Sequence, residues 1–96
     1  MVVYDRSDYW KFFKQHGYGD EKGAALLLRT KLLTVLVTEL NNKNWTQQEA
    51  AEKLGVKQPR ISEIYGMRVS KFSIDLLVKY LFRLGKEVDL DIFDAR

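Results

Sequence analysis

Residues 46–65 read TQQEAAEKLGVKQPRISEIY, and this stretch contains the start and stop signals of two short helices. Thr46 and Glu49 have the spacing of a capping box, in which each side chain accepts a hydrogen bond from the other residue's backbone amide. Gly55 suits the left-handed conformation that ends a helix, and Pro59 suits only the first turn of one. We therefore predict two helices of about two turns each, joined by a three-residue turn.

The apolar residues of this stretch allow its two helices to cross closely. Ala50 and Ala51 lack bulk at the crossing, while Ile61 and Ile64 anchor the second helix on a core. Two short helices joined by a glycine-containing turn form a helix-turn-helix. The second helix of such a unit fits the major groove of B-form DNA, so the pattern predicts a DNA-binding motif.

Polar side chains, Ser62 among them, occupy most of the remaining positions of the second helix. Gln58 suits a bidentate contact with adenine, Arg60 suits one with guanine, and Glu63 can accept from a cytosine amino group. The alternative is an ordinary solvated helix face. For Glu63 a further alternative is an ion pair with Arg60 or Lys57 in place of a base contact.

Helical periodicity continues on both sides of the motif. Leucine recurs every fourth residue from Leu28 to Leu40, which predicts a long scaffold helix over residues 21–42. Ser73 is a suitable N-cap for a further helix over residues 74–84. We expect the apolar faces of both helices to form the core around the motif.

A short helix is also expected over residues 8–16, and it contains more aromatic side chains than one short helix can bury by itself. These side chains either form a lid on the core, as buried aromatic residues usually do, or contact a partner protein. The aromatic residues are Tyr9, Trp10, Phe12 and Phe13.

Apolar and acidic side chains alternate over residues 87–93, which predicts a β-strand. A lone strand leaves its backbone groups unpaired, so we expect pairing within the chain or with the same strand of a twofold-related copy. In a homodimer the second arrangement would bury the apolar side chains of the dimer strand, Val88, Leu90 and Ile92.

Composition narrows the class of protein. A chain of 96 residues holds one modest core, and a formal net charge of +3 is compatible with nucleic-acid binding. Cysteine is absent and His16 is the only histidine, which argues against a metal centre and against histidine-based catalysis. Without a nucleophile–base pair or a phosphate-binding glycine loop, we expect neither an enzyme nor a cofactor. The longest apolar run, residues 24–28, is too short for a membrane span or signal peptide, so we expect a cytoplasmic protein.

Residues 46–62 resemble the lambda-repressor-like helix-turn-helix of the XRE family, and residues 28–32 and 72–77 resemble its HigA-type antitoxins. The resemblance covers about residues 20–92. It implies an all-α bundle, of about five helices here, to which the alternation adds one short C-terminal β-strand. It also implies a dimeric, sequence-specific repressor of a palindromic double-stranded DNA operator.

On this basis the chain divides into three parts. Residues 1–19 form an N-terminal aromatic helical extension, residues 20–85 form the helix-turn-helix domain, and residues 86–96 form the dimerisation strand. Many relatives of this type are antitoxins that neutralise a RelE-like ribonuclease toxin. If such a toxin exists for this chain, the aromatic extension is where we expect its contact.

The resemblance also assigns DNA contacts position by position. The first residue of the first motif helix touches a phosphate in the family, the exposed positions of the second helix read bases, and the loop after it supplies basic phosphate contacts. The base-reading set is Gln58, Pro59, Arg60, Ser62 and Glu63, with Pro59 against a thymine methyl group. The phosphate contacts assigned by the resemblance are Gln47 and Arg68, and Lys57 and Lys71 are further candidates nearby.

Two positions depart from the family pattern. Lys57 stands where serine or threonine usually caps the second motif helix. Met67 stands where glycine is usual, with Gly66 one place earlier, so we expect the loop that carries Arg68 to take a different path.

Three functions are compatible with these sequence features. The chain is a repressor that is also an antitoxin, a stand-alone or phage-type regulator without a toxin, or a protein-binding adaptor that reuses the fold. The basic residues around the second motif helix argue against the adaptor.

Overall fold

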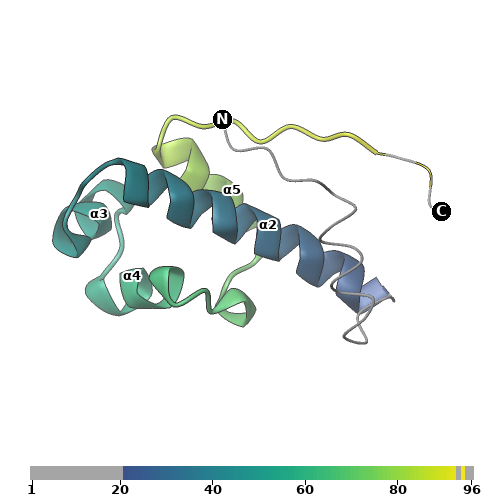
Figure 1. The fold of residues 1–96 in the computed structure, drawn as a ribbon, viewed down its shortest axis with the longest axis horizontal. Helices are drawn as coiled ribbons and strands as arrows, with labels where there is room; N and C mark the ends of the chain where they lie inside the picture. Colours follow the sequence, from purple (N-terminus) through teal and green to yellow (C-terminus); the bar gives the residue numbers. More distant parts are fainter. Residues whose placement is uncertain (1–20, 93, 95–96) are drawn as a thin grey trace.

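A computed structural model describes residues 21–92 and residue 94, and the described residues form four α-helices and one 3-10 turn (Figure 1). The predicted all-α class holds for this part of the chain. The helix expected over residues 8–16, with its four aromatic side chains, lies outside it. In chain order the elements are α2 (Glu21–Asn42), α3 (Gln47–Leu54), α4 (Gln58–Tyr65), η1 (Val69–Lys71) and α5 (Ile74–Arg83).

The bounds of these helices follow the local signals closely. The long scaffold helix and both motif helices begin and end where the sequence predicts. Helix α5 begins after its N-cap Ser73, whose hydroxyl accepts from the Leu76 amide, and ends one residue early because Leu84 acts as the C-cap. Lys57 makes no side-chain cap at the start of α4, as its chemistry predicts.

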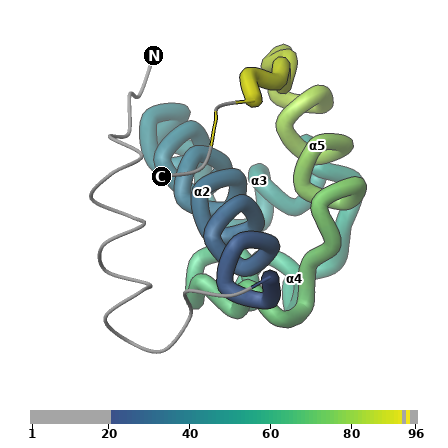
Figure 2. Tube along the Cα trace, turned by 90° about the vertical axis from the view of Figure 1, so that its right-hand side faces the viewer, coloured from purple at the N-terminus to yellow at the C-terminus, as the bar shows by residue number. Residues whose placement is uncertain are grey.

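The four helices surround one core. Helix α2 packs against α5, α4 and η1, and α3 packs against α4 and α5. Figure 2 shows α2 and α5 on two sides of this core, with α4 crossing beneath them. The buried apolar residues are Leu32, Leu33, Leu36, Leu40, Ala50, Ala51, Leu54, Ile61, Ile64, Phe72, Leu77, Tyr80, Leu81 and Leu84.

Three of the four leucines in the α2 repeat lie in the core. Leu32, Leu36 and Leu40 are buried, but Leu28 is 43% exposed. At 3.6 residues per turn, a four-residue spacing rotates by about 40° per step, so one repeat cannot keep four residues on one face. Among residues 21–92, no helix is both long enough and apolar enough to cross a bilayer.

The predicted C-terminal strand is absent from the described residues. Residues 86–92 lie extended above α2 in Figure 1 without pairing to any strand, because residues 21–92 contain no second strand to supply a partner. Lys86 forms an ion pair of 3.5 Å with Glu39 of α2 where this tail begins. Further along, three apolar side chains are exposed: Val88 (42%), Leu90 (70%) and Ile92 (85%).

Candidate nucleic-acid interface

The capping box places α3 as predicted. The Thr46 hydroxyl accepts a hydrogen bond from the Glu49 amide at 3.1 Å, and the Glu49 carboxylate accepts one from the Thr46 amide at 3.3 Å. Trp45, immediately before the cap, packs partly buried against the core. Lys43 and Lys53 lie over its ring, each with its ammonium nitrogen 5.8 Å from the ring centroid. These two lysines bring positive charge to α3 that the motif pattern did not predict.

The turn between α3 and α4 depends on one glycine. Gly55 has φ = 69°, in the left-handed region, as predicted for the end of α3. Arg83 of α5 donates a hydrogen bond to the Leu54 carbonyl, and a Cβ on Gly55 would lie 3.3 Å from the Arg83 guanidinium. The Arg83 guanidinium therefore supplies a hydrogen-bond donor to a carbonyl at the carboxyl-terminal end of α3, where the helix itself offers none. Sequence reasoning missed this contact, because its partners are far apart in the chain.

The first residues of the two motif helices are joined by a hydrogen bond. Gln58 Nε2 donates to Gln47 Oε1 at 2.5 Å, and both side chains are exposed. The structure thus brings together a residue predicted to touch a phosphate and one predicted to read a base. Since Gln47 takes one amide hydrogen of Gln58, the other hydrogen and the Gln58 oxygen remain for a bidentate contact.

The outer side of α4 carries two further predicted base-reading residues. Pro59 and Ser62 are both exposed, while Ile61 and Ile64 on the opposite side are fully buried. Lys57, just before the helix, is exposed too. The helix is therefore anchored by its isoleucines and presents a small, largely uncharged outer surface.

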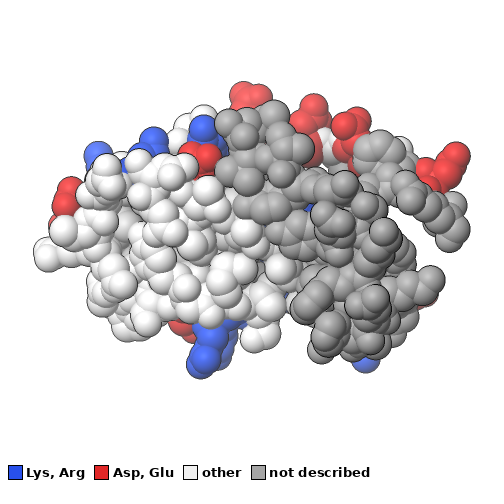
Figure 3. All heavy atoms as spheres, in the orientation of Figure 1, with Lys and Arg blue, Asp and Glu red and all other residues white. Residues whose placement is uncertain are grey.

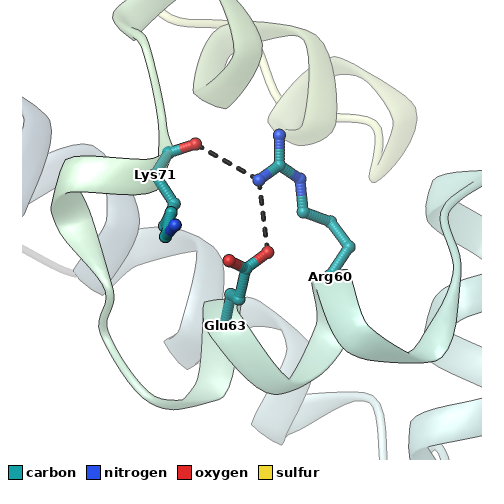
Figure 4. Close-up of polar contacts among 3 residues, drawn as sticks. All are labelled: Arg60, Glu63 and Lys71. Carbon is teal, nitrogen blue, oxygen red and sulfur yellow. Dashed lines mark hydrogen bonds and ion pairs between the residues drawn. The ribbon is translucent and has the colours of Figure 1, made fainter.

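Arg60 and Glu63 lie differently from the other predicted base-reading residues (Figure 4). Arg60 Nη1 donates to Glu63 Oε1 at 3.3 Å and to the Lys71 carbonyl at 3.2 Å. Its guanidinium carbon lies 4.7 Å from the Phe72 ring centroid. A hydrogen bond with the Tyr80 side chain raises the pKa of Arg60, and the Glu63 carboxylate adds to this against the opposing effect of burial. The ion pair with Glu63 is the alternative that the sequence left open.

The loop after α4 has methionine at the position where the family usually has glycine. Met67 itself adopts φ = 54°, the left-handed conformation for which glycine is usual, while Gly66 has φ = −78°. The Arg68 amide then donates to the Glu63 carbonyl at 3.0 Å. A non-glycine residue therefore makes the turn, and Arg68 and Lys71 both lie exposed beside α4.

Charge is distributed unevenly over the molecule. In Figure 3 acidic side chains line the upper edge along the tail, and basic side chains project both at the lower edge, where Figure 1 places α4 and η1, and at the upper left. The described acidic residues of the tail are Glu87, Asp89, Asp91 and Asp94.

Comparison with known proteins agrees with this geometry. A family model described as a helix-turn-helix domain matches residues 16–93, which is most of the chain. No curated protein matches the sequence.

Proposed function

The chain belongs to the helix-turn-helix domain family, and from this premise we propose that it is a sequence-specific transcriptional repressor of the XRE type that binds double-stranded DNA through α4. The bond between Gln47 and Gln58 carries the proposal, because it aligns the first residues of α3 and α4 on one exposed surface. A glutamine held in this way can contact adenine N6 and N7 while its partner donates to the adjacent phosphate.

The basic residues near α4 supply the second part of the interface. Lys57, Arg68 and Lys71 are exposed on segments that flank the helix on both ends. Phosphate contacts from such residues position the protein on the duplex without reading sequence. With the uncharged outer surface of α4 between them, this arrangement favours groove docking over a protein-binding adaptor.

Selection of binding sites from random duplex DNA, followed by gel-shift titration, tests the proposal. Gln58→Ala should relax preference at one base pair, and Gln47→Ala should weaken binding and partly relax the same position. Gln48→Ala is the matched control, since it removes an exposed glutamine from the next position of α3. Failure of the wild-type chain to select any sequence, or equal effects of all three variants, would refute the proposed interface.

We further propose that the repressor is a homodimer joined through its tail. The exposure of Val88, Leu90 and Ile92 supports this, because pairing with a second copy would bury all three and satisfy the backbone. Twofold pairing would present two α4 helices to half-sites roughly 10 bp apart. Leu90→Lys should give a folded monomer with weakened operator binding. A wild-type monomer in sedimentation, or a Leu90→Lys variant that stays dimeric, would refute the tail-paired dimer.

The resemblance to HigA-type antitoxins supports a second role as the antitoxin of a RelE-like toxin. Co-purification with the product of the adjacent reading frame tests whether such a partner exists. Deleting residues 1–18 should abolish toxin binding and spare DNA binding if the aromatic residues form the contact. Loss of the fold on deletion would instead indicate that these residues form a lid on the core.

A further inference from the structure

The positions of α4 outside the core fall into three strips. Gln58 lies at the edge toward α3, where it bonds to Gln47. Pro59 and Ser62 form the exposed outer strip. Arg60 lies at the opposite edge, where its guanidinium reaches the Lys71 carbonyl of η1. Its bond to η1 therefore turns the Arg60 guanidinium away from the outer strip.

Arg60 makes several contacts with neighbouring segments, although its side chain stays 32% exposed. It pairs with Glu63 within α4, donates to the Lys71 carbonyl and covers the ring of Phe72, which is 2% exposed. Tyr80 of α5, 3% exposed, packs edge-on against the Phe72 ring, with the two ring centroids 6.4 Å apart. To reach a guanine, the guanidinium would give up its contacts with Glu63, the Lys71 carbonyl and the Phe72 ring together.

We propose that Arg60 is a positioning residue, and that α4 reads A·T base pairs through Gln58, Pro59 and Ser62. This deepens the proposed function and rests on it. Gln58 suits adenine, the apolar ring of Pro59 suits a thymine methyl group, and Ser62 accepts either base. Because Glu63 is paired with Arg60, neither a guanine nor a cytosine has a charged reader on this helix.

The role of Arg60 is then to hold the basic turn against α4. Its bond to the Lys71 carbonyl fixes the end of η1, while the Glu63 carbonyl accepts from the Arg68 amide at the start of the loop. Both phosphate-contacting candidates of this loop are thus tied to α4. Lys57, at the other end of the helix, is linked to the Arg60 backbone, whose amide donates to the Lys57 carbonyl at 3.0 Å, and this bond does not depend on the guanidinium.

Binding-site selection with the full-length chain gives the first test. The wild type should select A·T pairs at the centre of each half-site. Arg60→Ala should weaken every operator variant by a common factor, whereas Gln58→Ala should reduce discrimination at one pair by about 5- to 150-fold. A selected G·C pair that only Arg60→Ala relaxes would overturn the positioning role. Selection of no sequence by the wild type would overturn the proposed function and this inference together.

The salt dependence of DNA binding tests whether Arg60 positions the basic turn or only supports the fold. Arg60→Ala should lower the slope of log K against log salt, and Lys71→Ala should then lower it little further. Lys57→Ala is the matched control and should still lower the slope by about 0.9 in the Arg60→Ala background. An unchanged slope in Arg60→Ala, at temperatures where the variant remains folded, would overturn the link to the turn.

Nuclear magnetic resonance of the complex gives a direct reading. The Arg60 side-chain protons should be shifted upfield by the Phe72 ring in the free protein, and the shift should persist on operator binding. Its loss in the complex would show that Arg60 turns toward the DNA and would overturn the inference.

Discussion

Replacing Gly55 with alanine should lower the free energy of unfolding for two separate reasons. The first is conformational, because Gly55 has φ = 69°. The second is steric, because an added Cβ would lie 3.3 Å from Arg83 Nη1 while the same guanidinium donates to the Leu54 carbonyl. Gly85 supplies the matched control, since it has φ = 79° and nothing within 4 Å of the added atom.

The expected magnitudes follow from these two demands. A left-handed alanine costs about 1–2 kcal/mol, offset by about 0.4–1 kcal/mol because alanine restricts the unfolded chain, which leaves roughly 1 kcal/mol net. Gly85→Ala should show only this cost. In Gly55→Ala the displaced Arg83 bond should add about 1 kcal/mol, for a total near 2 kcal/mol.

Thermal and urea unfolding measure the difference, and for a domain of this size each kcal/mol lowers Tm by about 4–8 °C. In an Arg83→Met background Gly55→Ala should cost no more than Gly85→Ala does in the wild type. Equal costs for the two glycine variants in the wild type would refute the steric part of the reasoning. A cost well below 0.5 kcal/mol for both, against the roughly 1 kcal/mol expected, would refute the conformational part.

Five other substitutions test the helix start, the loop and the phosphate contacts. Thr46→Ala removes the hydroxyl that accepts from the Glu49 amide but keeps the backbone amide that donates to the Glu49 carboxylate, and it should lower the free energy of unfolding by about 1 kcal/mol in urea titrations; no change would show that the hydroxyl bond contributes nothing. Met67→Gly relieves a left-handed methionine and should raise it by about 0.5–1 kcal/mol, and a loss of stability would contradict the strain. Single alanine variants of Lys57, Arg68 and Lys71 should each lower the salt slope of DNA binding by about 0.9 and leave sequence preference intact, so three unchanged slopes would place the docking face elsewhere.

The bounds of the helices could be predicted because their signals are local. Thr46, Glu49 and Gly55 act through bonds and backbone angles within one helix, and each appears in the structure as its chemistry requires. The same holds for the missing cap at Lys57. Such features need no knowledge of the tertiary fold.

The orientation of Arg60 could not be predicted in this way. Its surroundings come from Phe72 and Tyr80, twelve and twenty residues further along the chain, and only packing of η1 and α5 against α4 brings them near. A helical pattern states which side of α4 a residue occupies, but it does not state what covers that side. The contact of Arg83 with α3 was missed for the same reason.

The C-terminal tail illustrates a different limit. Alternation of Val88, Leu90 and Ile92 with acidic residues describes a backbone that suits a sheet, but a strand exists only with a neighbour. Within residues 21–92 there is none, so the tail is extended without being a strand. The alternation therefore predicts that the tail can pair as a strand, but the described part of one copy supplies no partner strand.

Among the described residues, the acidic tail lies above α2 and the exposed basic residues that flank α4 lie below it (Figure 1), so these two charge clusters form a local dipole. The positive cluster is formed by Lys57, Arg68 and Lys71, and the negative cluster by Glu87, Asp89, Asp91 and Asp94. In the field of a polyanion such a dipole experiences a torque before any contact forms, so diffusing molecules arrive with α4 turned toward the duplex more often than random rotation allows. Because the Debye length shrinks from about 30 Å at 0.01 M salt to about 8 Å at 0.15 M, this rotational guidance acts over only a few molecular layers of water at physiological ionic strength.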